Sequence, residues 1–174
     1  MDKGDQLSQA KQPRSIVAGP YGHPFHPILV TIPIGTWAAS LVFDILAIFL
    51  EESRSALLLG SQVLIAIGVL GGLLAAVFGF LDYSVIPAGT RAKRTATTHM
   101  ALNLVIVVLF AIDYFVRVAA GHDEVPVGGV VLSVIGLALL GMSGYLGGEL
   151  AYRFGVRVAS EETQAKAYGR GSGH

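Results

Sequence analysis

The chain has 174 residues, of which 53% are hydrophobic and only 14% charged, and its mean hydropathy is +0.63. This composition is typical of an integral membrane protein. The formal net charge is +0 and the basic residues form no long run, which argues against a nucleic-acid partner. Cysteine is absent, which excludes disulfides, thiolate-bound iron–sulfur clusters and covalently attached haem, so any cofactor would be held by His, carboxylate, Tyr or Met.

The sequence predicts an all-α fold, an integral membrane four-helix bundle that runs up-down-up-down. A helix needs roughly 20 apolar residues to cross a bilayer. Four stretches meet this length, at about 26–50, 55–81, 98–117 and 125–148. A polar N-terminal arm, 1–22, precedes the transmembrane domain, 23–158, and we expect a flexible C-terminal tail over 159–174.

Lys and Arg are concentrated in three places: before the first span, in the central loop over 82–97, and after the fourth span. Short loops rich in these residues stay on the cytoplasmic side of a membrane. The N-terminal arm lacks the basic start and short apolar region of a cleaved signal peptide, so we expect the first span to be retained. Both termini are therefore predicted to be cytoplasmic.

The first span opens with the segment GHPFHP, residues 22–27, which holds His23 and His26 on a stiff, proline-rich lead-in. These imidazoles could bind a metal or haem iron, or serve as caps and interfacial anchors. His26 and Asp44 are about five helical turns apart and so share one face of the helix. Pro33 predicts a kink in this span.

The third span opens with His99 and has polar residues at heptad-like spacing on one face. That face comprises His99, Asn103, Ile106, Phe110, Asp113 and Arg117. Polar groups inside hydrocarbon are costly, so this face should point to the bundle axis. Asp113 and Arg117 form an i,i+4 pair, and Asp44 could pair with Arg117 or Arg54, which makes a structural role the simpler interpretation of both acids.

Glycines are frequent in the second and fourth spans. Gly68 with Gly72, and Gly144 with Gly148, have the small-xxx-small spacing that lets helices approach closely in lipid. Three interpretations remain open: close packing within the bundle, a dimer interface, or space for a flat cofactor.

The four spans also resemble one hairpin used twice. Each half has a histidine, then an aspartate, then a glycine–aromatic–leucine segment with an acid, GFLDY at 79–83 and GYLGGE at 144–149. Parallel repeats of this kind would bring His26, Asp82, His99 and Glu149 together at the cytoplasmic end. Chance similarity between apolar helices is the alternative.

The strings GHPFHPILVTIPIG, GFLDY, TTHMALN and SGYLGGELAYRFGV together resemble the bacterial membrane family catalogued as domain of unknown function 2231. The resemblance covers roughly 21–158 and implies a four-helix domain of the bacterial inner membrane without an established activity. Some relatives are joined to Rieske-type or cytochrome-type domains, which implies redox surroundings by association. This chain has no such domain, so a centre of that kind would be on a redox partner protein.

The leading functional hypothesis is a subunit that binds b-type haem between the first and third spans for electron transfer. His26 and His99 would be the axial ligands. The guanidinium groups of Arg91, Arg94 or Arg153 would pair with the haem propionates.

A second hypothesis is a membrane metal-binding or transport protein. Its mixed nitrogen and oxygen ligands would suit a divalent zinc, iron or manganese ion. The candidate ligands are His23, His26, Asp82, His99 and Glu149. A third hypothesis is a non-catalytic scaffold or assembly subunit. No nucleophile elbow or phosphate-binding loop is present, so the sequence supports no particular enzyme activity.

Overall fold

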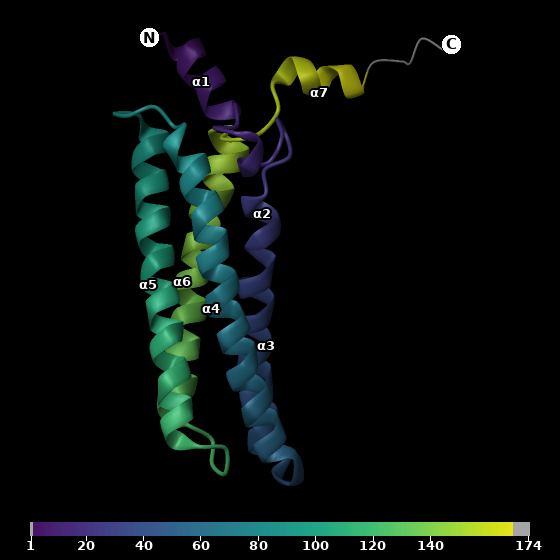
Figure 1. Cartoon of the computed structure of the whole chain (residues 1–174), viewed down its shortest axis with the longest axis vertical. Helices are drawn as coiled ribbons and strands as arrows, with labels where there is room; N and C mark the ends of the chain where they lie inside the picture. The colour runs from purple at the N-terminus through teal and green to yellow at the C-terminus, as the bar shows by residue number, and fades with distance from the viewer. Residues whose placement is uncertain (1, 169–174) are drawn as a thin grey trace, which may run out of the picture.

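The computed structural model describes residues 2–168, and every regular element in that range is helical. Four long helices lie along one axis (Figure 1). They are α3 (Thr31–Phe49), α4 (Arg54–Ser84), α5 (Arg91–Ala120) and α6 (Val127–Gly148). Together with their short flanking turns, all four are long and apolar enough to cross a membrane. The prediction of an all-helical fold with four apolar helices is confirmed.

Shorter elements cover the two ends of the long helices. They are α1 (Lys3–Lys11), η1 (Ile16–Ala18), α2 (His26–Leu29), η2 (Glu51–Ser53), the π-helical turn η3 (Glu149–Arg153) and α7 (Glu161–Ala167). The end of the bundle that carries α1, α2 and α7 is called the terminal end here, and the opposite end, with η2 and the loop 121–126, the far end (Figure 1).

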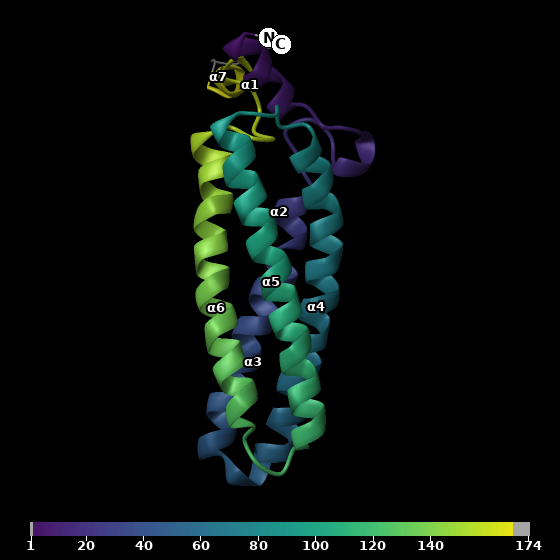
Figure 2. The ribbon, with the colours of Figure 1, turned by 90° about the vertical axis from the view of Figure 1, so that its left-hand side faces the viewer.

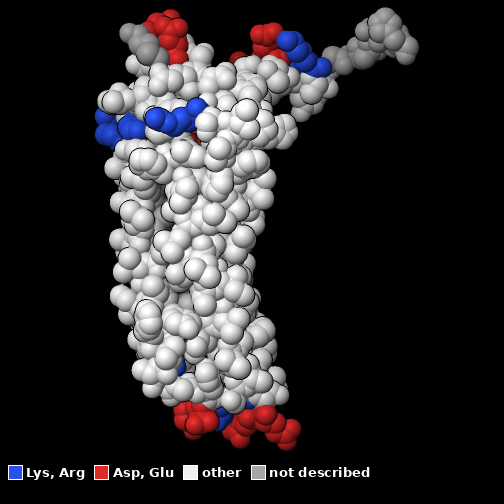
Figure 3. All heavy atoms as spheres, in the orientation of Figure 1, with Lys and Arg blue, Asp and Glu red and all other residues white. Residues whose placement is uncertain are grey.

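The helices pack in a ring. α4 packs against α3 and α5, while α6 packs against α5 and, less extensively, against α3. This order leaves α3 and α5 diagonally opposite, with α2 on the same side as α3 (Figure 2). The face shown in Figure 3 is uncharged along most of its length, with both basic and acidic groups near the terminal end and mainly acidic groups at the far end. Such an apolar surface suits contact with lipid.

Pro33 explains the break between α2 and α3. In a continuous helix the Leu29 carbonyl would accept a hydrogen bond from residue 33, but proline has no N–H to donate. The helix is interrupted at Val30, whose amide still donates to the His26 carbonyl at 3.1 Å. His26 therefore lies on a separate helical turn rather than on α3 itself.

The central connection is shorter than the predicted loop over 82–97. α4 continues to Ser84 and α5 already begins at Arg91. Thr90 caps α5, since its Oγ1 accepts a hydrogen bond from the Lys93 amide at 3.1 Å. An N-cap of this kind starts a helix independently of hydropathy, so two polar turns precede the apolar part of α5.

The inward faces of α3 and α5 are those that the sequence periodicity predicts. Trp37 and Phe110, both at most 1% exposed, stack with ring centroids 4.1 Å apart and planes 7° from parallel. Ile65 and Ile106 complete this apolar core. Large side chains thus fill the middle of the bundle.

Several glycines of α4 and α6 are close to side chains of neighbouring helices. A Cβ on Gly68 would lie 2.2 Å from Trp37 Nε1, and one on Gly136 would lie 2.6 Å from Phe110 Cε2. Gly60 and Gly71 would meet Phe43 and Ile32 in the same way. The glycines of α4 and α6 that face the bundle therefore accommodate its own side chains, in agreement with close packing within the bundle.

We expect Gly68→Ala to lower the free energy of unfolding by about 1–3 kcal/mol, because the added methyl group overpacks the site against the Trp37 indole. Gly141→Ala is the matched control, since a Cβ there meets nothing within 4 Å. Denaturant unfolding of the two variants in detergent checks this. Equal stability of the two variants would contradict the packing described.

The N-terminal arm is folded against the segment that follows η3. The amide of Arg157 donates to the Ala10 carbonyl at 3.0 Å, and Lys11 Nζ donates to the Val158 carbonyl at 3.4 Å. The Ser160 amide donates to the Tyr21 hydroxyl at 2.7 Å, and hydrogen bonding with Ser160 lowers the pKa of this phenol. Part of the tail predicted to be flexible is the helix α7, and residues 169–174 lie outside the described range.

Candidate functional site

Two imidazoles meet near the terminal end of the bundle. His26 comes from α2 and His99 from α5, and their ring centroids are 6.4 Å apart with planes at 84°. Both side chains are half-buried. We call these two residues the histidine pair. The structure thus brings together the two histidines that open the first and third spans.

Each imidazole is oriented by a backbone carbonyl of a neighbouring helix. His26 Nδ1 lies 2.9 Å from the Ala75 carbonyl oxygen of α4, and His99 Nδ1 lies 2.9 Å from the Ser143 carbonyl oxygen of α6. A carbonyl only accepts hydrogen bonds, so Nδ1 carries the proton in both rings. In the neutral form of a ring held in this way the lone pair is on Nε2, which is the arrangement found in metal-binding histidines.

The position of the His99 ring is further defined by Asn103. The amide Nδ2 of Asn103 lies 3.2 Å from His99 Nε2, 2.8 Å from the His99 carbonyl oxygen and 2.7 Å from Ser143 Oγ. An amide nitrogen only donates, so His99 Nε2 is the acceptor. This contact agrees with a proton on Nδ1.

Glycines on the partner helices leave space for the two rings. A Cβ on Gly79 would lie 2.9 Å from His26 Cε1, and a Cβ on Gly147 would lie 3.3 Å from His99 Cε1. Contacts of this kind are tighter than ordinary van der Waals contact. The backbones of α4 and α6 are thus part of the wall behind each imidazole.

The other predicted metal ligands are engaged elsewhere. Asp82 Oδ1 lies 2.7 Å from Arg157 Nε, and Glu149 Oε1 lies 3.3 Å from Arg91 Nη2. His23 is exposed and contacts only the Tyr21 carbonyl, at 3.4 Å. Within residues 2–168 no three or more His, Cys, Asp or Glu side chains form a group that could hold a metal ion. Of the proposed ligand set, only His26 and His99 meet as a pair.

The arginines predicted to pair with propionates lie near the terminal end. Arg91 and Arg153 both contact Glu149 Oε1, at 3.3 and 3.4 Å, and their side chains are about two-thirds exposed. Arg94 is exposed. All three are on the first turns of α5 or on η3, close in sequence to His99 or to Gly147.

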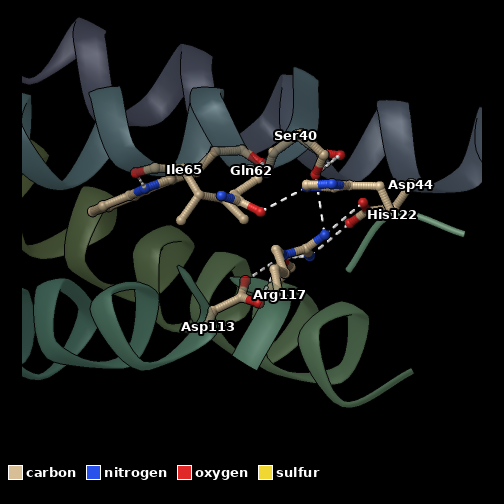
Figure 4. A network of polar contacts seen from close by, with 10 residues as sticks. Ser40, Asp44, Gln62, Ile65, Asp113, Arg117 and His122 are labelled. Carbon is tan, nitrogen blue, oxygen red and sulfur yellow. Dashed lines mark hydrogen bonds and ion pairs between the residues drawn. The ribbon is translucent and has the colours of Figure 1, made fainter. Parts of the chain in front are cut away.

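A second polar group is buried toward the far end. Arg117 is hydrogen-bonded to two aspartates and two serines in the interior (Figure 4). Its Nη1 and Nη2 lie 2.7 and 2.8 Å from the two carboxylate oxygens of Asp44, and its Nε lies 2.8 Å from Asp113 Oδ1. Ser61 Oγ and Ser133 Oγ accept the remaining two hydrogen bonds, at 3.2 and 3.1 Å. We call these five residues the arginine cluster.

The arginine cluster uses all five N–H donors of one guanidinium, which is the full capacity of that group. The structure therefore selects Arg117 over Arg54 as the partner of Asp44. Arg54 instead lies 3.5 Å from Glu51 at the far end. Asp44 and Asp113 are both paired with Arg117 inside the bundle, in agreement with a structural role.

Sequence reasoning missed three groups that define these sites. The sequence places Arg157 only among the basic residues that follow the fourth span, but its side chain is 3% exposed and its Nη2 donates to the carbonyls of Ala18 and Gly19. It has a positive φ of 60°, which hydropathy does not predict. The serines of the arginine cluster and the carbonyl acceptors of the histidine pair depend on helix register, for which the sequence offered no signal.

Comparison with known proteins yields a family and nothing more specific. No curated protein and no solved structure matches the chain. A family model described as predicted membrane protein matches residues 22–160, which includes all four long helices, the histidine pair and the arginine cluster. The resemblance seen in the sequence is thereby confirmed, and the chain belongs to the membrane protein family DUF2231.

Proposed function

We propose that the histidine pair binds b-type haem and that the protein is an electron-transfer subunit of the membrane. The observation that carries the proposal is the meeting of two imidazoles from diagonally opposite helices, with ring centroids 6.4 Å apart. Two imidazoles that bind one metal from opposite sides have centroids roughly 6 Å apart, because each metal–nitrogen bond is about 2 Å long. At this spacing His26 and His99 would be able to hold one iron between them.

The protonation of the rings also supports this proposal. Hydrogen bonds from Nδ1 to the Ala75 and Ser143 carbonyls keep Nε2 available as a ligand and fix the plane of each ring. Ligation through His99 Nε2 replaces its contact with Asn103, whose amide retains the His99 carbonyl and Ser143 Oγ as partners.

The bound haem would supply one-electron redox chemistry. The chain would position the haem and would set the polarity and the charge of its surroundings. His26 and His99 would hold the iron. The haem propionates would pair with Arg91, Arg94 and Arg153 at the terminal end. Arg91 and Arg153 would then give up their present contacts with Glu149. A redox partner protein would dock at this end, since the exposed side chains of Arg91, Arg94 and Arg153 lie there.

We further propose that the two hairpins are repeats. His26 and Trp37 are eleven residues apart, as are His99 and Phe110, and Gly68 and Gly79 have the same separation as Gly136 and Gly147. In the first half His26 contacts Gly79 and Trp37 contacts Gly68. In the second half His99 contacts Gly147 and Phe110 contacts Gly136. This matches Gly79 with Gly147 instead of Gly144, so the acids Asp82 and Glu149 are not equivalent positions.

The proposed orientation has both termini in the cytoplasm of the bacterial inner membrane. Most Lys and Arg residues lie at the terminal end, in agreement with the preference of these residues for cytoplasmic loops (Figure 3). The histidine pair would then lie near the cytoplasmic face of the membrane.

The test is a reduced-minus-oxidised visible spectrum of protein purified in mild detergent, together with iron and porphyrin analysis. We expect haem bands at one haem per chain, and loss of these bands or a changed spectrum in His26→Ala and in His99→Ala, since each variant removes one of the two imidazoles that would hold the iron. His23→Ala and His122→Ala are the matched controls and should retain the spectrum, because neither ring is part of the pair.

Two outcomes would reject the haem proposal. Stoichiometric metal without porphyrin absorbance, lost in His26→Ala and His99→Ala, would favour a metal-ion site. Neither metal nor porphyrin after expression with sufficient iron and haem precursor would favour a scaffold subunit.

A further inference from the structure

The arginine cluster has an unbalanced charge. It contains two carboxyl groups and one guanidinium, and Asp44, Asp113 and Arg117 are at most 1% exposed. Asp113 is seven residues before the end of α5, a rise of about 10 Å along the helix axis. It therefore lies inside the apolar part of the bundle. With all three groups ionised the cluster would have a net charge of −1, and an uncompensated charge in such a place is strongly unfavourable.

The other cationic groups nearby do not balance this charge. Arg54 lies 3.5 Å from Glu51 and 4.0 Å from Glu124, and it donates to the Ala47 carbonyl. His122 Nε2 lies 2.8 Å from Gln62 Oε1 (Figure 4). Within residues 2–168, Arg117 is the one cationic side chain within ion-pair distance of Asp44 or Asp113. A proton or another small cation would balance the remaining charge.

The hydrogen bonds indicate where a proton would be held. Both oxygens of Asp44 and Oδ1 of Asp113 accept N–H groups of the guanidinium. Asp113 Oδ2 instead faces a hydroxyl, Ser133 Oγ, at 2.7 Å. A hydroxyl can donate to a carboxylate or accept from a carboxylic acid, so this contact suits either protonation state.

A metal cation fits the cluster less well than a proton. A Cβ on Gly129 would lie 2.8 Å from Asp113 Oδ1 and 3.2 Å from Arg117 Cγ, so α6 closes tightly over this side. Hard cations such as calcium or magnesium need about six oxygen ligands, including waters in most sites. A proton on Asp113 needs only one acceptor, and Ser133 Oγ lies 2.7 Å from Asp113 Oδ2.

We propose that the arginine cluster is a buried proton-binding site, with one proton held between Asp113 Oδ2 and Ser133 Oγ. The protonated cluster is electrically neutral, with one guanidinium, one carboxylate and one carboxylic acid. This proposal is independent of the haem proposal, because the stacked rings of Trp37 and Phe110 lie between the two sites.

Infrared difference spectroscopy of the full chain tests the proposal. At neutral pH we expect the C=O band of one protonated carboxyl group per chain, which shifts in heavy water and on labelling with isotope-substituted aspartate. Asp113→Asn and Asp44→Asn should each remove this band completely, since either change leaves one carboxylate for one guanidinium. Asp82→Asn is the matched control and should retain the band, because Asp82 is paired with Arg157.

The wild-type spectrum is informative even where an asparagine variant fails to fold. Absence of an aspartic acid band from the wild-type protein, in buffers with and without sodium, would show that both carboxyl groups are ionised and would overturn the proposal. Persistence of the band in both folded asparagine variants would overturn it as well, since the proton would then be on another group.

Discussion

Arg117→Leu should lower the free energy of unfolding by about 3–5 kcal/mol, the range for removal of one member of a buried ion pair. The substitution leaves Asp44 and Asp113 without a guanidinium and leaves Ser61 and Ser133 without their donors. Arg54 is engaged with Glu51 and with the Ala47 carbonyl at the far end and does not replace those contacts. Denaturant titration in mixed micelles measures the effect.

The control for this substitution is Arg153→Leu. Arg153 also contacts a carboxylate, Glu149 at 3.4 Å, but 65% of its side chain is exposed. Exposed ion pairs contribute about 0–1 kcal/mol. A loss in Arg117→Leu that is no greater than the loss in Arg153→Leu would show that the arginine cluster does not stabilise the bundle.

Trp37→Ala should lower the free energy of unfolding by a similar amount, about 3–5 kcal/mol, because it opens a large cavity in the middle of the bundle. Trp37 is 1% exposed, stacks on Phe110 and fills the space beside Gly68. Its indole N–H also donates to the Ile65 carbonyl at 3.3 Å. Lipid cannot replace these contacts, since the site is enclosed.

Phe115→Ala is the comparison for Trp37→Ala. Phe115 is 67% exposed on the outer face of α5, where lipid chains can fill the space that its ring leaves. We expect a change well below that of Trp37→Ala in the same unfolding titration. Similar losses in the two variants would mean that the interior is packed no better than the lipid-facing surface.

The sequence predicted the buried faces of α3 and α5 because hydrophobic and polar residues repeat with the period of a helix. His26 and Asp44 were expected on one face, and both point into the bundle. The convergence of His26 and His99 also followed from the sequence, since both open odd-numbered spans at one end of the bundle.

The details of the sites depend on features that a single sequence does not reveal. The register between helices decides that His26 meets the Ala75 carbonyl. It also decides that Asp44 pairs with Arg117 and not with Arg54. The burial of Arg157 depends on the N-terminal arm, which folds over the terminal end and supplies its carbonyl partners. These are tertiary contacts with no local periodicity.

The two polar sites are expected to act independently. An apolar layer formed by Trp37, Ile65, Ile106 and Phe110 lies between the histidine pair and the arginine cluster. Asp113→Asn should therefore leave the visible spectrum unchanged, and His99→Ala should leave the infrared band unchanged.

The most direct test of the central claim, that both imidazoles hold one iron, is electron paramagnetic resonance of the oxidised protein. Two axial imidazoles give a low-spin ferric signal, and loss of either one gives a high-spin signal if haem is retained at all. We predict a low-spin wild-type spectrum, converted to high spin or lost in both His26→Ala and His99→Ala and unchanged in His23→Ala. A low-spin signal that survives in either His26→Ala or His99→Ala would contradict the account.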